Sequence, residues 1–248
     1  MNYKIIQISI VILTFYCQTH AQIVTDRPDQ TESSSTVPKG TLQIESGIQI
    51  SFAENNEITT RQALLPTNLF RFGLAEWIEI RFLNQLETIK VGNQQNTGIS
   101  DLEIGTKIQI YKEEDRNTEI AVLSHLIVPT GTNEITGNSY GISNKLSISH
   151  ELNEMIGVGY NVGYNYFGEG NGDITYSLAF GLGVNNKVGM YVEPFGELFD
   201  MSHFVLNFDT GFTYLVTKNL QFDFSFGVGL TQQMNYVSIG CSWALNKD

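Results

Sequence analysis

The stretch "NLQFDFSFGVGL" at residues 219–230 decides the fold class, because its side chains alternate strictly in character. The large apolar side chains occupy the even positions and the polar or small residues the odd ones: Leu220, Phe222, Phe224, Phe226, Val228 and Leu230 against Gln221, Asp223, Ser225, Gly227 and Gly229. A period of two predicts a β-strand with two unlike faces. The apolar face could pack inward in a soluble sandwich or outward against lipid in a membrane barrel.

Similar alternation recurs about every 15 to 20 residues, with turn signals between the segments. It predicts twelve strands, at 41–52, 60–73, 77–88, 99–112, 119–130, 141–151, 155–167, 173–184, 187–198, 203–216, 219–230 and 235–246. Strands of about ten residues or more can cross a bilayer at a tilt. They are also longer than the usual strands of globular proteins, which have about 5–6 residues.

Composition excludes two classes of protein. The 248 residues carry a net charge of −12, and the pI near 4.7 argues against nucleic acid as a partner. After residue 21 no apolar run reaches the about 18 residues that a membrane helix needs. The mean hydropathy of −0.09 looks like that of a soluble protein. A membrane barrel can have such a value, because only half of each strand faces lipid.

The N-terminus, "MNYKIIQISIVILTFYCQTHAQ", has the features of a secretory signal peptide. Lys4 precedes an apolar run at 5–16, and Ala21 offers a small residue for cleavage. We therefore divide the chain into a signal peptide at 1–21, a periplasmic N-terminal segment at 22–40 and an outer-membrane barrel at 41–248. The mature chain would keep only Cys241, so it could form no internal disulfide.

The inward face and the connections favour the barrel over the sandwich. The odd positions hold mainly small or charged side chains. A closed barrel needs small inward side chains, because its interior volume is limited and its wall must curve. The outer face of a sandwich lies in bulk water, where runs of glycine would bring no advantage. Short polar connections, such as 152–154 and 217–219, alternate with longer ones. The sequence therefore predicts an all-β fold, a transmembrane antiparallel up-and-down β-barrel of about twelve strands with both termini in the periplasm. Pro66 and Pro194 lie inside expected strands, and we expect either bulges there or strand ends that project beyond the hydrocarbon.

Three segments carry a resemblance to a known family: "TDRPDQTESSSTVPKGTLQIESGI" at 25–48, "LFRFGLAEWIEIRF" at 69–82 and "GISDLEIGTKIQI" at 98–110. They resemble the outer-membrane transporter family of the meta-pathway phenol-degradation proteins, over nearly the whole mature chain. The resemblance implies an outer-membrane barrel with a transport role. It does not imply that this protein handles phenols, and it brings no catalytic residues.

Charged residues on the first four expected strands form the candidate site. By parity they face the barrel interior: Glu45, Arg71, Glu79, Arg81, Asp101, Glu103 and Lys107. Such groups could pair as a network that stiffens the barrel, since an unpaired buried charge is costly. They could also form a polar constriction that selects solutes by charge and size. Both interpretations stay open, with pore-lining as the role we assign.

Residues 22–40 are rich in Ser, Thr, Asp and Pro, which by default indicates a flexible periplasmic lead-in. The alternative is that Asp26, Arg27 and Asp29 fold back and plug the lower mouth of the barrel.

The leading hypothesis for function is passive passage of small solutes, hydrophobic or aromatic ones among them, with outer-membrane lipid around the barrel and no cofactor. "HELNE" at 150–154 lacks the second His of a zinc site, so we expect no metal and no catalytic residues. One alternative is a structural barrel with an occluded lumen. The other, an outer-membrane lipid-modifying hydrolase, would need a Ser, a His and an acid from different strands to meet at the outer surface.

Overall fold

The computed structural model describes residues 23–55, 58–113 and 117–245, so the expected signal peptide at 1–21 lies outside the described residues. The described chain is all-β. Its strands are β1 (Leu42–Asn55), β2 (Ile58–Ala75), β3 (Ile78–Val91), β4 (Gln94–Ile99), β5 (Leu102–Glu113), β6 (Thr118–Val128), β7 (Gly141–Asn153), β8 (Ile156–Tyr166), β9 (Asp173–Gly183), β10 (Val188–Phe199), β11 (His203–Thr217), β12 (Leu220–Gly229) and β13 (Gln233–Leu245). None of the described segments is a helix long and apolar enough to cross a bilayer.

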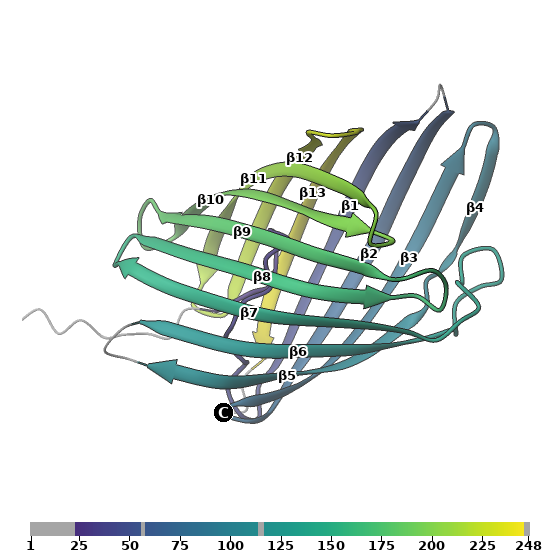
Figure 1. Ribbon diagram of the computed structural model, residues 1–248. Helices are drawn as coiled ribbons and strands as arrows, with labels where there is room; N and C mark the ends of the chain where they lie inside the picture. Colours follow the sequence, from purple (N-terminus) through teal and green to yellow (C-terminus); the bar gives the residue numbers. More distant parts are fainter. Residues whose placement is uncertain (1–22, 56–57, 114–116, 246–248) are drawn as a thin grey trace, which may run out of the picture.

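The strands close into an antiparallel barrel (Figure 1). Each ring strand pairs with its neighbours in sequence, and β1 pairs with β13 from Leu42 opposite Leu245 to Glu54 opposite Gln233. Because β4 pairs only with the end of β3, the ring consists of the other twelve strands. The predicted up-and-down barrel of twelve strands is confirmed.

The expected strand at 99–112 is interrupted. Strand β5 begins at Leu102, and Ser100 and Asp101 separate it from β4. The expected strands at 77–88 and 99–112 leave 89–98 as a connection, but most of this connection is strand, because β4 extends the β3 hairpin beyond the ring through a tight turn with Gly92 at φ 57°. Polar "QQNT" has no apolar alternation, and hence no signal by which its sequence could show a strand.

The two prolines within strands behave differently. The β2–β3 register shifts between Leu64 and Thr67, so Pro66 lies in the expected bulge. Pro194 pairs with Phe208 of β11 without any shift, so the first of the two expectations, a bulge, is not found at this proline. Pairing of β10 with β9 stops after Val192 and resumes in the same register at Phe195. The missing N–H of Pro194 therefore falls at a local gap in the ladder, which removes the need for a bulge.

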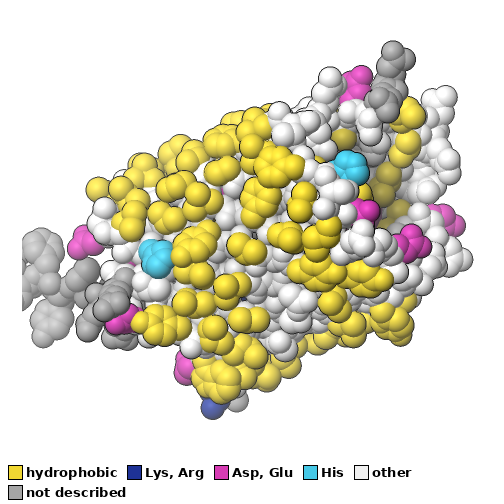
Figure 2. Space-filling model, in the orientation of Figure 1, with side chains coloured by type: hydrophobic (Ala, Val, Ile, Leu, Met, Phe, Trp, Pro, Cys, Tyr) yellow, Lys and Arg dark blue, Asp and Glu magenta, His cyan; other side chains and the backbone are white. Residues whose placement is uncertain are grey.

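The barrel is apolar outside and polar inside. Phe222 and Phe226 are 49% and 51% exposed, whereas Asp223 and Ser225 between them are buried. Figure 2 shows apolar side chains spread over the outer face of the strands. The largest fully buried side chains are charged, with Arg71, Arg81 and Lys107 first among them. Such an inverted distribution fits a lipid surround and a polar lumen.

The two rims differ as the sequence predicts. One rim carries short turns, for example between Asn153 and Ile156 and between Thr217 and Leu220. The other carries the longer loops at 129–140 and 167–172. Strand β13 ends at Leu245, opposite Leu42 at the start of β1, on the short-turn rim.

Candidate functional site

The N-terminal segment, residues 23–40, lies inside the ring of strands (purple in Figure 1). It leaves the barrel wall at the short-turn rim, where the Gly40 N–H donates to the carbonyl of Gly73 at 2.8 Å. Ile23 and Val37 are buried. The segment is thus not the flexible lead-in that its composition indicates, because inward-facing polar groups satisfy its backbone.

The segment follows the inner wall of the barrel. The N–H groups of Asp26 and Arg27 donate to Glu45 of β1, and the N–H of Gln30 donates to Glu193 of β10 at 2.7 Å. The Glu32 N–H then donates to Asn161 of β8, also at 2.7 Å.

The second half of the segment completes the circuit. The Ser34 hydroxyl lies 2.5 Å from that of Ser149 on β7, and the Ser35 hydroxyl donates to Glu119 on β6. The N–H of Val37 donates to Glu79 on β3 at 2.8 Å, which brings the segment back to the basic side of the barrel. Residues 26–37 therefore lie across the lumen and contact strands around the ring.

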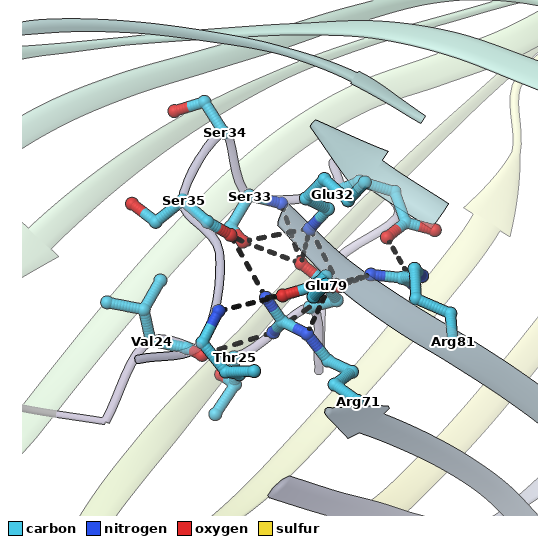
Figure 3. Close-up of polar contacts among 12 residues, drawn as sticks. Val24, Thr25, Glu32, Ser33, Ser34, Ser35, Arg71, Glu79 and Arg81 are labelled. Atoms are coloured by element: carbon cyan, nitrogen blue, oxygen red, sulfur yellow. Dashed lines mark hydrogen bonds and ion pairs between the residues drawn. The ribbon is translucent and has the colours of Figure 1, made fainter. Parts of the chain in front are cut away.

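A basic cluster from three neighbouring strands holds one side of the segment: Arg71 (β2), Arg81 (β3) and Lys107 (β5). Arg71 donates to Glu79 from Nε and to Glu45 from Nη1, both at 2.9 Å. Figure 3 shows Arg71, Glu79 and Arg81 beside residues 32–35 of the segment. Buried charges are tolerated only when paired in this way.

Asp26 joins this basic cluster to the segment. Its carboxylate lies 3.4 Å from Arg71 Nη1, 2.5 Å from Arg81 Nη1 and 2.9 Å from Lys107 Nζ. Burial alone would raise the pKa of Asp26, but the three cations hold it well below its usual value. Glu32 adds a second carboxylate, 2.9 Å from Arg81 Nη2. The wall therefore supplies cations and the segment supplies anions.

On β12, which β1 and β13 separate from β2, the charges are reversed, and Arg27 of the segment meets a carboxylate. Its Nη2 donates to Asp223 of β12 and to Ser238 of β13, each at 2.9 Å. Gly47 and Gly240, paired across β1 and β13, give the guanidinium room. A Cβ at either position would lie 2.5 Å from the nearest guanidinium nitrogen. The two glycines thus form a slot for this arginine.

The acidic wall contains residues that the sequence analysis missed. Glu193, Asp209 and Asp223 are buried on β10, β11 and β12. Tyr236 donates its hydroxyl to Asp209. The three carboxylates have the same inward parity as the basic cluster, so the alternation of β10 to β12 carries the signal for them.

The predicted lumen set is only partly brought together. Glu45, Arg71, Glu79, Arg81 and Lys107 form one buried network. Glu103 reaches that network through His125, which lies 2.8 Å from Glu103 and accepts from Arg81 Nε at 3.0 Å. Sequence reasoning missed His125, although its parity points inward.

Asp101 lies apart from the network. Its carboxylate accepts the N–H groups of Gly131 at 2.8 Å and Gly137 at 3.0 Å in the loop at 129–140. Among the segment residues, Asp29 has no ion pair within the described ranges and lines two cavities.

Cavities lie on both sides of the segment. Two open cavities of about 680 and 510 Å³ lie toward the short-turn rim, where Asp29 and Gly157 line both. A third, of about 250 Å³, lies toward the long-loop rim and includes Gln30, Lys145 and Asn207. The segment separates these spaces.

Catalytic and metal chemistry find little support in the described part of the chain. Ser202 Oγ lies 2.7 Å from His203 Nδ1 on the long-loop rim, but no acidic side chain among the described residues bonds to this imidazole. No group of three His, Cys, Asp or Glu residues in the described ranges could hold a metal ion.

The closed ring, the exposed apolar belt and the polar interior define a class of protein, the outer-membrane β-barrels. The chain belongs to the family described as "Putative MetA-pathway of phenol degradation", whose model matches residues 25–241. Comparison of the sequence with curated proteins gives no match.

Solved structures show the same fold. An outer-membrane channel from Pseudomonas putida F1 superposes with a TM-score of 0.71 at 13% identity, over 86% of this chain and 98% of that one. The KdgM porin, solved with disordered oligogalacturonate, has a TM-score of 0.56 at 11% identity, over 81% and 98%. The translocator domain of autotransporter NalP from Neisseria meningitidis has 0.53 at 11%, over 87% and 90%. Identities this low show the fold alone.

Proposed function

We propose that this protein is a passive outer-membrane channel for small solutes and that its N-terminal segment is a movable plug. In this proposal the long-loop rim faces the outside and the short-turn rim the periplasm. Outer-membrane lipid covers the apolar belt, and the protein is not an enzyme. The known structures with this fold that are named channel and porin support a transport role.

One observation carries the proposal: the segment crosses the lumen between cavities by contacts that are almost all polar. The ion pairs of Asp26 and Arg27 hold it to two separate parts of the wall, β2 to β5 and β12. Polar contacts inside a wet lumen can exchange with water at little net cost. A segment held in this way can therefore move without exposing an apolar core.

Two of the predicted roles become parts of this proposal. The basic cluster of Arg71, Arg81 and Lys107 serves as the docking site of the plug and lines the pore when the plug leaves. Asp26 and Arg27 anchor the plug to the two walls, while Asp29 faces the cavities. The structural barrel with a permanently occluded lumen is the competing proposal, because the segment fills the same space in both.

A reversible crosslink separates the two. Ser34 and Ser149 face each other with hydroxyl oxygens 2.5 Å apart, so cysteines at both positions could form a disulfide between plug and wall. The pair Ser34→Cys and Ser149→Cys would be made in a Cys241→Ala background. We expect the oxidised protein to stay closed in planar bilayers and the reduced protein to conduct and to release small solutes from liposomes.

The control is the Ser34→Cys single variant in the same background, which cannot form the crosslink and should respond to neither oxidant nor reductant. If the reduced double variant and the unmodified protein both fail to conduct and to release solutes, the channel proposal fails. The occluded structural barrel would then be the better account.

A further inference from the structure

The cavity on the long-loop side of the plug has features of a binding site. It has a volume of about 250 Å³, and Gln30 of the plug contributes to its lining. We call it the vestibule and define it by six wall residues: Lys145, Asn161, Thr175, Ser177, Glu197 and Asn207. It lies just below the range of about 300 to 1,000 Å³ typical of sites for drug-sized ligands, which indicates a small occupant.

One cation and one carboxylate of the vestibule share a row across the barrel wall. Lys145 lies opposite Gly163, Gly163 lies opposite Thr175, and Thr175 lies opposite Glu197. Three strand spacings of about 4.8 Å separate the two charged residues by about 14 Å along the wall. Only a glycine and a threonine stand between them, so no large side chain of this row separates the two charged residues.

The Lys145 side chain leans into that space. A Cβ at Gly163 would lie 2.9 Å from Lys145 Cγ and 2.5 Å from Thr175 Oγ1, so the glycine makes room for the lysine. The only ion pair of Lys145 among the described residues is a long one, 3.5 Å from Nζ to Glu32 Oε1 of the plug. Its ammonium group can therefore take another anion.

At the other end, Glu197 faces no cation. Within the described ranges no hydrogen bond or ion pair reaches its carboxylate, and the neighbouring charge that acts on it is that of Asp173, also negative. The Asp173 carboxylate accepts the N–H of Asp200 at 2.8 Å. This end of the vestibule therefore favours a positively charged group.

A second row lies next to the first, toward the plug. Asn161, Ser177 and Asn207 are paired through Phe195, so their polar groups share the inner face. Asn207 is 5% exposed, and its Oδ1 accepts no hydrogen bond from the described residues although the residue lines the cavity. A buried acceptor without a donor is costly, so this atom calls for a donor from the occupant.

We propose that the vestibule binds a free α-amino acid, with its ammonium group at Glu197 and its carboxylate at Lys145. Asn207, whose Oδ1 has no donor among the described residues, supplies a further hydrogen bond, while Asn161 and Ser177 hold the plug beneath the site. The inference rests on the proposed channel function, because it names the class of solute that waits above the plug. A phenol lacks both charges and would satisfy neither end of the site.

Calorimetric titration of the full-length protein in detergent tests this directly, with L-alanine as the probe. We expect L-alanine to bind and glucose and phenol not to bind at the same concentrations. Glu197→Gln and Lys145→Met should each weaken L-alanine binding at least tenfold, because each removes a charge-assisted contact. Glu169→Gln, which neutralises an exposed carboxylate in the neighbouring loop, should leave the affinity unchanged.

L-alaninamide, which has the ammonium group but no carboxylate, assigns the two ends separately. Its binding should be lost with Glu197→Gln and unaffected by Lys145→Met. The inference is overturned if L-alanine does not bind, or if neither variant changes its affinity. Binding in detergent needs no open pore, so a protein that conducts without binding L-alanine refutes the inference alone, and one that binds but never conducts refutes the channel alone.

Discussion

At the scale of single residues, the plug depends on the fit of Arg27 into a slot without side chains. The guanidinium lies against Gly47 and Gly240 while it bonds to Asp223 and Ser238. Glycine is required here for close approach of a side chain, since any Cβ would occupy the same space. The absence of a side chain at Gly47 and Gly240 therefore allows the ion pair between Arg27 of the plug and Asp223 of the wall.

Gly240→Ala should therefore open the plug without unfolding the barrel. The new Cβ would lie 2.5 Å from Arg27 Nε, at the end of a flexible side chain that can move away and leave Asp223. A charge-assisted contact contributes about 1.5 kcal/mol or more, so the open fraction should rise about tenfold. Single-channel recordings measure that open probability.

Gly157→Ala is the matched control for this prediction. It lies on the inner face of β8, and its new Cβ would come no closer than 3.8 Å to a neighbouring atom, the carbonyl oxygen of His150. Its open probability should equal that of the unmodified protein. Equal values for both variants would contradict the role assigned to the arginine slot.

At the scale of elements, the break between β4 and β5 organises the loop at 129–140. Asp101 stands at this break and accepts the N–H groups of Gly131 and Gly137. Burial would raise the pKa of Asp101, but the Thr136 hydroxyl and these two amides bond to the carboxylate and hold the pKa below its usual value. A lowered pKa means that the folded loop binds the ionised form more strongly than the unfolded loop does.

Asp101→Asn should accelerate amide hydrogen exchange at Gly131 and Gly137 at neutral pH, because the neutral amide offers one acceptor oxygen instead of two.

In the unmodified protein the stabilisation of the loop by Asp101 is complete above the ordinary aspartate pKa of about 3.9 and is lost as the pH falls through the lowered value. Amide chemical shifts followed from pH 6 downward would report the loss. Glu134→Gln, an exposed change in the same loop, should alter neither; a loss of protection there equal to that of Asp101→Asn would contradict the assignment.

The strands themselves were predictable from the sequence and the path of the plug was not. Alternation in stretches such as 219–230 gives both the strand and the face that lines the lumen, since lipid and a polar lumen impose opposite demands on adjacent side chains. The same parity placed Asp101 wrongly in the lumen set, because Asp101 lies in the break between β4 and β5 and not in a strand. Residues 23–40 have no periodicity, and their contacts join residues as far apart as Arg27 and Asp223, 196 positions along the chain. Sequence proximity cannot reveal such pairs.

At the scale of the whole molecule, charge is divided across the lumen. Arg71, Arg81 and Lys107 lie on β2, β3 and β5, and the carboxylates Glu193, Asp209 and Asp223 lie on β10 to β12. The plug is complementary to both sides. Removal of one wall charge should therefore change two properties together, the hold on the plug and the ion preference of the open pore.

Arg81→Ala tests this coupling. Arg81 bonds to Asp26 and Glu32 of the plug at 2.5 and 2.9 Å and to Glu79 at 3.0 Å, so its loss loosens the plug and leaves three carboxylates with less compensation. We expect more frequent opening and a shift of the reversal potential in a KCl gradient toward K⁺. A charge at about 4 Å in water contributes about 1 kcal/mol, which corresponds to a change of about fivefold in the permeability ratio. Lys218→Ala removes an exposed cation from the turn between β11 and β12, away from the described contacts of the plug, and it should leave both quantities close to those of the unmodified protein. Identical reversal potentials for all three proteins would mean that the basic cluster does not face the conducting path.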